Sequence, residues 1–356
     1  MNPDAIDETG RVPHGGDSDP DVLDFSANVN TARPAGVKAV YREALQSSRR
    51  YPDDDYPEYR EVASEYVGCS PSNVVPTPGG LAGIRLALEC VLERGKKVLI
   101  PYPSFGEYSR EVRLQGATPT FVPHDDVLET DRRALEEHAV AFICTPNNPT
   151  GDLSDPERLE AFAKRCADAG TTLLIDEAFL GFTDVPSMAA VLWGDREDGN
   201  IDSDQHSLEN VVVVRSLTKL FGLPGLRAGF VVASGNRLDR FETARRTWNL
   251  GTPAARVGAH CMLDEAFVRK TRDRIEEERR RIVDRLEERF DVFQSDAPFV
   301  LCRIPDRNVS ELVASCRRRS VAIRDATTFR GLDNHVRIAV KDRDRNDRML
   351  EVLCDV

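Results

Sequence analysis

The chain has 356 residues, 40% of them hydrophobic and 30% charged, which allows two domains or one large domain with an appendage. Its 60 acidic and 48 basic residues give a net charge of −12, which makes nucleic acid a poor partner. No apolar run is long enough for a membrane span, and the acidic N-terminus lacks the order of a secretory signal. We therefore expect a cytoplasmic protein with no membrane partner, in which the first ten residues form a disordered tail.

Arginine is far more frequent than lysine, since only seven lysines are present. An acidic, lysine-poor surface is typical of proteins from a high-salt cytoplasm, although a GC-rich genome would also favour arginine. The eight cysteines are scattered without C-x-x-C spacing, and the six histidines do not cluster with them. We therefore expect no metal site and mostly buried, reduced thiols.

Short apolar stretches alternate with helical ones through most of the chain, as in a largely parallel sheet covered on both faces. The expected strands are 22–25, 74–76, 97–100, 118–122, 140–144, 172–175, 211–215, 227–233, 300–304, 322–324 and 337–340. The expected helices are one that ends near 48, then 58–67, 81–93, 104–114, 155–169 and 265–290. The last is highly charged and predicts a solvated face with ion pairs four residues apart. The acidic stretch 194–209 predicts a surface loop.

These elements predict an α/β fold with a mostly parallel central sheet, helices on both of its faces, and a small α+β domain. We expect residues 1–45 to form an N-terminal arm that contributes to the small domain. Residues 46–250 would then form the large domain, and residues 251–356 the small C-terminal domain.

Polar residues follow three of the apolar strands. Asn148 and Asp176 stand at or just after the ends of two strands, and the run Ser216–Lys219 follows a third. Ligands of such sheets bind beyond the carboxyl ends of the strands. The sequence therefore predicts a site where these residues converge.

The segment Arg215-Ser216-Leu217-Thr218-Lys219, with Arg227 eight residues further on, resembles the fold-type-I enzymes that use pyridoxal 5′-phosphate (PLP), the aspartate-aminotransferase superfamily. The resemblance covers nearly the whole chain. It implies that the Lys219 amine carries the cofactor and that Ser216 and Arg227 hold its phosphate. Asp176 would pair with the pyridine nitrogen, because a nearby carboxylate keeps that nitrogen protonated and able to accept charge.

Further cofactor contacts follow from the same resemblance. It implies that Asn148 contacts the phenolic oxygen and that Phe105 stacks on the pyridine ring. The turn before the helix at 81–93 would offer the backbone N–H groups of Gly80 and Leu81 to the phosphate. Tyr51 would reach the phosphate bound by the other subunit, which implies a homodimer with shared active sites.

The motif His14-Gly15-Gly16, the string Leu23–Asn30 and the segment Ile323-Arg324-Asp325 resemble the L-threonine-O-3-phosphate decarboxylases of cobalamin biosynthesis. Phe179 also fits, because related aminotransferases usually carry a tyrosine there that bonds the phenolic oxygen. The resemblance implies decarboxylation to (R)-1-amino-2-propanol phosphate. It also implies that the substrate phosphate is bound mainly by His14, Gly15, Asn28 and Arg324. Asn148 and Arg337 would bind the substrate carboxylate.

The chain departs from the family pattern at the glycine-rich turn, where Pro78, Leu81 and Ala82 replace polar residues. One alternative is a PLP-dependent aminotransferase that acts on a phosphorylated amine such as histidinol phosphate. Another is a PLP-binding regulator without turnover, which would carry a DNA-binding domain. The acidic composition and the short segment before Val22 argue against the regulator.

Overall fold

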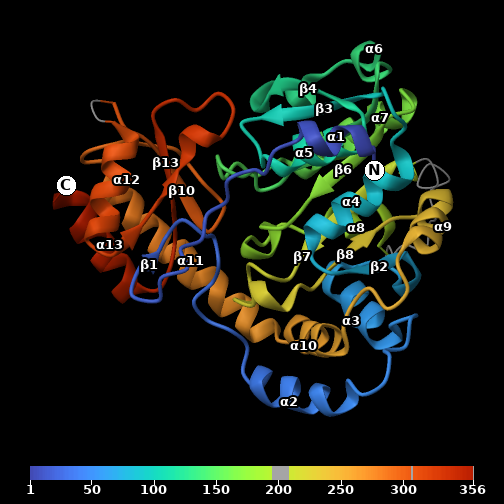
Figure 1. Cartoon of the computed structure of the whole chain (residues 1–356), viewed down its shortest axis with the longest axis horizontal. Coiled ribbons are helices and arrows are strands. Elements are labelled where there is room, and N and C mark those ends of the chain that lie inside the picture. Colours follow the sequence, from blue (N-terminus) through green and yellow to red (C-terminus); the bar gives the residue numbers. More distant parts are fainter. Residues whose placement is uncertain (195–207, 306–307, 356) are drawn as a thin grey trace.

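The computed structural model describes residues 1–194, 208–305 and 308–355. Its centre is a seven-stranded sheet in the order β2-β8-β7-β6-β5-β3-β4 (Figure 1). β8 runs antiparallel to both of its neighbours, and the remaining pairs are parallel. The strands are β2 (Val74–Thr77), β3 (Lys97–Tyr102), β4 (Thr118–Pro123), β5 (His138–Cys144), β6 (Thr172–Asp176), β7 (Val211–Ser216) and β8 (Gly229–Val232).

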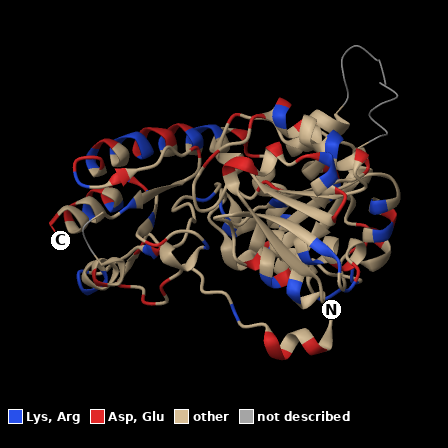
Figure 2. Ribbon diagram, turned by 90° about the horizontal axis from the view of Figure 1, so that it is seen from above, with Lys and Arg blue, Asp and Glu red and all other residues tan. Residues whose placement is uncertain are grey.

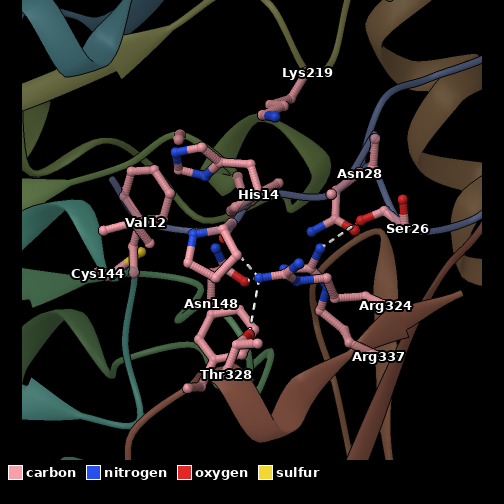
Figure 3. A pocket seen from close by; sticks show the side chains of 18 of the residues that line it. Val12, His14, Ser26, Asn28, Cys144, Asn148, Lys219, Arg324, Thr328 and Arg337 are labelled. Atoms are coloured by element: carbon pink, nitrogen blue, oxygen red, sulfur yellow. Dashed lines mark hydrogen bonds between the residues drawn. The ribbon is translucent and has the colours of Figure 1, made fainter. Parts of the chain in front are cut away.

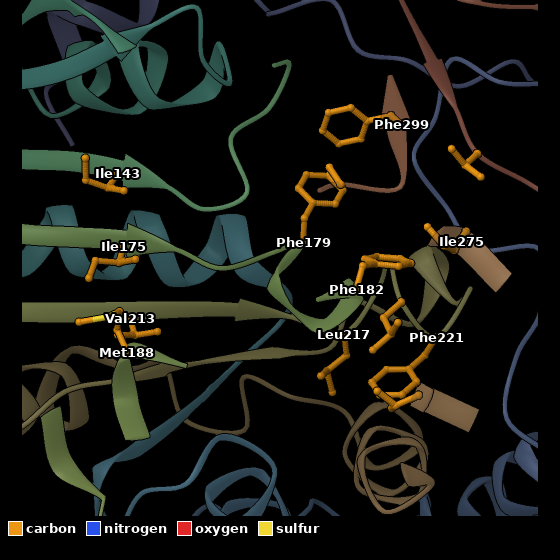
Figure 4. Close-up of a cluster of buried hydrophobic side chains, with 14 of the residues drawn as sticks. Ile143, Ile175, Phe179, Phe182, Met188, Val213, Leu217, Phe221, Ile275 and Phe299 are labelled. Carbon is orange, nitrogen blue, oxygen red and sulfur yellow. The ribbon is translucent and has the colours of Figure 1, made fainter. Parts of the chain in front are cut away.

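The hydrophobic core has two layers, one on each face of the sheet, because successive side chains along a strand point to opposite faces. On β7, Val211 and Val213 join one hydrophobic cluster, whereas Val212 and Val214 join the other. Figure 4 shows Ile143, Ile175 and Val213 on one face, where the strand register pairs them as neighbours. Both faces of the inner strands are therefore apolar, as continuous hydrophobic runs predict.

Helices cover each layer. α4 (Gly80–Val91), α5 (Glu107–Leu114) and α9 (Gly235–Ala244) contribute to the layer of Val212 and Val214. The layer of Val211 and Val213 is covered by α3 (Pro57–Val67), α7 (Pro156–Asp168), α8 (Met188–Trp193) and α10 (Thr252–Met262). α2 (Val37–Ser47) packs on α10, and the short α6 (Arg132–Leu135) precedes β5. The predicted α/β fold with helices on both faces is confirmed.

A second sheet has four antiparallel strands in the order β12-β13-β10-β9. Outside it, β1 near the N-terminus pairs in parallel with β11, so the N-terminal arm joins this part of the molecule. The boundaries 1–45, 46–250 and 251–356 stay a prediction. The elements here are β1 (Leu23–Asp24), α11 (Glu265–Leu286), β9 (Asp291–Val292), β10 (Phe299–Arg303), α12 (Val309–Arg318), β11 (Val321–Ala322), β12 (Arg324–Asp325), β13 (His335–Ala339) and α13 (Arg343–Asp355).

The prediction of a disordered tail over the first ten residues is wrong. Residues Pro3–Glu8 form the short helix α1, which contacts α5. The backbone N–H of Asn2 donates to the carbonyl of Leu114 at 2.7 Å, and Arg94 pairs with Asp4. These partners lie 90 or more residues away in the chain, so the local composition of the tail does not reveal them.

Charged residues lie mainly on the helices, and few occur on the strands of the central sheet (Figure 2). On α11, Glu265 pairs with Arg269 and Glu276 with Arg280, as the four-residue spacing predicted.

Within the described part of the chain, no helix is long and apolar enough to cross a membrane. All eight cysteines are free, and six of them are buried. Of the predicted loop at 194–209, residues 195–207 lie outside the described residues.

Candidate functional site

A cavity of about 220 Å³ lies beyond the carboxyl ends of β5, β6 and β7, between the two sheets. Figure 3 shows His14, Asn148, Arg324 and Arg337 gathered around it, with Lys219 at its edge. Nine of the predicted site residues line the cavity: His14, Gly15, Asn28, Phe105, Asn148, Asp176, Lys219, Arg324 and Arg337. Five others do not: Tyr51, Gly80, Leu81, Ser216 and Arg227.

Lys219 follows β7 and brings an amine to the cavity. Burial, followed by the positive charges of Arg337 and Arg227, lowers the pKa of this amine to about 8 against the opposing charge of Asp176. A lysine with a depressed pKa has more of the neutral, nucleophilic form near neutral pH. The position is therefore chemically suited to attack on a carbonyl carbon.

Asp176 ends β6 and is 6% exposed. Its Oδ2 accepts a hydrogen bond of 2.7 Å from the Tyr108 hydroxyl, and its Oδ1 accepts one of 3.0 Å from the backbone N–H of Ala178. Burial raises the pKa of the Asp176 carboxyl, whereas the Tyr108 and Ala178 hydrogen bonds oppose that rise. The carboxylate is held in one orientation and would gain from a cationic partner in the cavity.

Tyr108 is a site residue that the sequence analysis missed. It lies three residues after Phe105, and the two rings meet edge to face with centroids 5.5 Å apart. Burial raises the pKa of the Tyr108 phenol well above its usual range, so the group stays a neutral donor toward Asp176. The available signal was its position three residues after Phe105 within the predicted helix 104–114, since residues at this spacing lie on the same face of a helix.

Arg337 on β13 meets Asn148 at the bottom of the cavity. Its guanidinium donates to Asn148 Oδ1 and, at 2.8 Å, to the carbonyl of Ser26. Burial, followed by the nearby positive charge of Arg324, lowers the pKa of Arg337 to about 9. Among the described residues, the buried Arg337 Nε and Asn28 Oδ1 have no hydrogen-bond partner. Unpaired buried polar atoms are costly, and a polar ligand in the cavity would supply the missing partners.

Arg324 on β12 lines the same cavity from the second sheet. Its Nη2 donates to the carbonyl of Pro13 at 2.7 Å and to Thr328 Oγ1 at 2.9 Å. Gly15 packs tightly here, because a Cβ at this position would lie only 2.0 Å from the carbonyl oxygen of Ser26. The predicted contacts at residues 14, 15 and 324 thus come together although about 300 residues separate them. Thr328 is a further lining residue that the sequence did not indicate.

The predicted phosphate contacts form a separate group next to the cavity. α4 begins at Gly80, and a Cβ on the preceding Gly79 would lie 2.5 Å from Arg227 Nη2. A Cβ on Gly80 would lie 3.3 Å from that of Ser216, whose hydroxyl is 2.9 Å from Thr218 Oγ1. An arginine, two hydroxyls and a helix N-terminus therefore meet at glycines whose missing side chains let the arginine approach the start of α4.

Tyr51 lies away from the cavity of its own chain. Its side chain is 75% exposed and stacks on Trp248, with ring centroids 4.0 Å apart. Leu81 also stays outside, and only its backbone N–H at the start of α4 could serve a phosphate. The roles predicted for these two residues stay predictions.

No metal site was predicted from the sequence. Within the described residues, one group has ligand atoms within 4.8 Å of one another, namely His124, Asp125 and Asp152. Two of the three are exposed, and none of them lines the cavity.

The site fits PLP in four respects. Lys219 offers a buried amine for its aldehyde, and Asp176 offers a fixed carboxylate for its pyridine nitrogen. The Gly79–Gly80 turn with Ser216 and Arg227 offers donors for its phosphate. Phe105 lines the same cavity and would cover the pyridine ring.

Comparison with known proteins agrees with this chemistry. Residues 20–353 match the family described as aminotransferase class I and II. Histidinol-phosphate aminotransferase 2 of Archaeoglobus fulgidus is 30% identical over 95% of this chain and 94% of its own length. A candidate threonine-phosphate decarboxylase of Caldanaerobacter subterraneus is also 30% identical, over 92% of this chain and 88% of its own.

Solved structures share the fold. The crystal structure of histidinol-phosphate aminotransferase from Clostridium acetobutylicum superposes with a TM-score of 0.83 at 26% identity, covering 94% of this chain and 98% of that one. That of histidinol-phosphate aminotransferase from Sinorhizobium meliloti, in complex with PLP, gives a TM-score of 0.80 at 20% identity, covering 92% and 89%. The chain described here belongs to the class I and II aminotransferase family of PLP-dependent enzymes.

Proposed function

We propose that this enzyme decarboxylates L-threonine-O-3-phosphate to (R)-1-amino-2-propanol phosphate, as in cobalamin biosynthesis. One observation carries the proposal. Arg324 contacts the segment of His14 through the Pro13 carbonyl, so motifs from the two ends of the chain meet at one side of the cavity. Arg337 lies nearby with an unpaired Nε. Two arginines suit a short substrate that carries both a phosphate and a carboxylate.

In this proposal the chain's own residues divide the work. Arg337 and Asn148 bind and orient the carboxylate, while Arg324, His14, Gly15 and Asn28 bind the phosphate. When bound, PLP supplies the electron sink for the bond that breaks. Asp176 would hold the positive charge of the pyridine nitrogen, and the ammonium form of Lys219 would deliver to Cα the proton that replaces the departing carboxylate.

Phe179 supports a decarboxylase over a transaminase. It is buried at the cavity and packs edge to face on Phe299, with ring centroids 5.1 Å apart. It offers no hydroxyl to the cofactor, unlike the tyrosine that related aminotransferases usually carry there. The likeness to the Caldanaerobacter protein supports the same assignment.

The second candidate is an aminotransferase that acts on histidinol phosphate. It is favoured by the names of several relatives, including the Archaeoglobus fulgidus protein. Either enzyme would act on a phosphorylated amine. For both candidates we also propose a homodimer, in which the exposed Tyr51 reaches the phosphate bound by the partner.

A product assay separates the two candidates. The purified enzyme is supplied with PLP in high salt and given L-threonine-O-3-phosphate without any keto acid. We expect carbon dioxide and 1-amino-2-propanol phosphate in equal amounts. Turnover of histidinol phosphate with 2-oxoglutarate, without release of carbon dioxide from the first substrate, would instead assign the protein to the aminotransferases.

A further inference from the structure

Glu107 is a buried acid beside the cavity, and it has no role in the proposed reaction. It begins α5 and is 5% exposed. Its Oε1 lies 2.8 Å from His14 Nε2, and its Oε2 accepts a hydrogen bond of 3.2 Å from Arg110. His14, in contrast, is about half exposed, and its ring lies 5.7 Å from that of Phe105. The fixed partner in this contact is therefore Glu107, and the residue that it holds is His14.

The segment around His14 is held from two sides. From α5, Arg110 Nε donates to the carbonyl of Gly10 at 3.1 Å, and Val12 packs on Gly106. A Cβ at Gly106 would lie 2.7 Å from Val12 Cγ1, so only glycine leaves room for this contact. From the second sheet, Arg324 holds the carbonyl of Pro13. The segment 10–15 thus closes one side of the cavity between α5 and β12.

We propose that Glu107 is a positioning residue for substrate phosphate, which acts by holding the imidazole of His14 over the cavity. The inference rests on the proposed function, in which His14 contacts the phosphate. A carboxylate only accepts hydrogen bonds, so His14 donates from Nε2 to Glu107. A phosphate oxygen also accepts, so the imidazole binds it in the doubly protonated form, with Nδ1–H as the second donor. Arg110 and His14 share the negative charge of Glu107, which would otherwise oppose an incoming phosphate.

The test compares Glu107→Gln, His14→Ala and the double variant as PLP-loaded enzymes. Steady-state kinetics give KM for L-threonine-O-3-phosphate, and calorimetry gives the affinities for inorganic phosphate and L-threonine. We expect Glu107→Gln to weaken binding of both phosphate-bearing ligands about tenfold, the effect of losing one charge-assisted hydrogen bond. Binding of L-threonine should not change. In the His14→Ala background the same substitution should have no further effect, because coupled residues are not additive.

Glu278→Gln is the matched control. Glu278 is also a buried acid on a helix, but its hydrogen-bond partners are Arg281 and Asn346, and it does not line the cavity. We expect this variant to keep the phosphate affinity of the unaltered enzyme. If Glu107→Gln does not fold, as judged by circular dichroism, Glu107→Asp replaces it. Aspartate keeps the charge but withdraws it from His14, and the same loss is expected.

Two results would overturn the inference. One is an equal loss of affinity for L-threonine and its phosphate ester, which would make Glu107 merely structural. The other is additivity of the Glu107 and His14 substitutions. Failure of the proposed function looks different, because the enzyme would then bind inorganic phosphate through His14 and Glu107 but release no carbon dioxide from L-threonine-O-3-phosphate.

Discussion

The phenol of Tyr108 donates a 2.7 Å hydrogen bond to Oδ2 of Asp176, and both side chains are buried. Together with the N–H of Ala178 on Oδ1, this bond leaves the carboxylate no freedom to rotate. The Tyr108 ring is itself fixed, since it stacks on Phe142 with centroids 4.7 Å apart. The Asp176 carboxylate, which would face the pyridine nitrogen, is thus held in place by Tyr108 from α5.

Replacing Tyr108 by phenylalanine should slow catalysis without abolishing it. The variant loses one hydrogen bond to a charged group, a loss worth about 1.5–3 kcal/mol, and kcat should fall by about tenfold or more. The PLP content, measured by absorbance, should stay close to stoichiometric. Tyr56→Phe is the control, because it also loses a buried hydrogen bond, to Leu250, but one remote from Asp176. Unchanged kcat in Tyr108→Phe would show that Asp176 does not need this support.

The pH dependence of cofactor attachment should report the pKa of Lys219. The neutral amine reacts with the aldehyde, so attachment of PLP to the cofactor-free protein should speed up as pH rises and level off above about 8. In Arg337→Gln a positive charge is lost, the pKa of Lys219 rises, and the midpoint should move to higher pH. A midpoint near 10.5 in the unaltered protein would contradict the buried position of this amine.

Borohydride reduction followed by peptide mass spectrometry should place the cofactor on Lys219 and leave Lys341 unlabelled. Lys341 is the matched internal control, because burial lowers its pKa to about 8 as well. Its Nζ donates to the carbonyls of Ala27 and Val29 at 2.8 and 2.9 Å, and it does not line the cavity. Label on Lys341, or turnover retained in Lys219→Ala, would exclude Lys219 as the reactive amine.

Arg324→Ala should raise KM for a phosphorylated substrate while leaving cofactor binding unchanged. Its guanidinium lines the substrate side of the cavity and is not part of the glycine turn predicted to hold the cofactor phosphate. Loss of a charge-assisted contact to the substrate should raise KM tenfold or more, and each factor of ten corresponds to about 1.4 kcal/mol. Arg330→Ala removes an arginine stacked over Phe121 that does not line the cavity, and serves as the control. An unaltered KM in Arg324→Ala would remove this residue from the site.

Glu177→Gln should destabilise the fold rather than alter chemistry directly. The Glu177 carboxylate is buried and accepts hydrogen bonds from Arg215, Ser187 and the N–H of Met188. Its loss leaves the buried charge of Arg215 without its partner, at a cost of about 3–5 kcal/mol in the free energy of unfolding. Urea unfolding measures this free energy. Glu265→Gln is the control, because Glu265 forms an exposed ion pair with Arg269, and its free energy of unfolding should change by less than about 0.5 kcal/mol.

Much of the fold could be predicted from local patterns. The apolar runs at β5, β6 and β7 predicted inner strands, and their ends predicted where Asn148, Asp176 and Lys219 would meet. This works because a parallel sheet brings the carboxyl ends of its strands to one edge, whatever the connecting helices contain. Strand ends and glycine turns are local features, so they can be located from the sequence of this chain alone.

Other features depended on contacts between distant segments. The tail that composition marked as disordered forms α1 and leads into a segment that lines the cavity. The partners in Tyr108–Asp176 and His14–Glu107 are 68 and 93 residues apart. No periodicity of 2 or 3.6 residues encodes such pairs, because they form only when α5, β6 and the N-terminal arm have packed together. The sequence by itself determined the strand ends and the reactive groups, and the tertiary structure decided which buried side chains orient them.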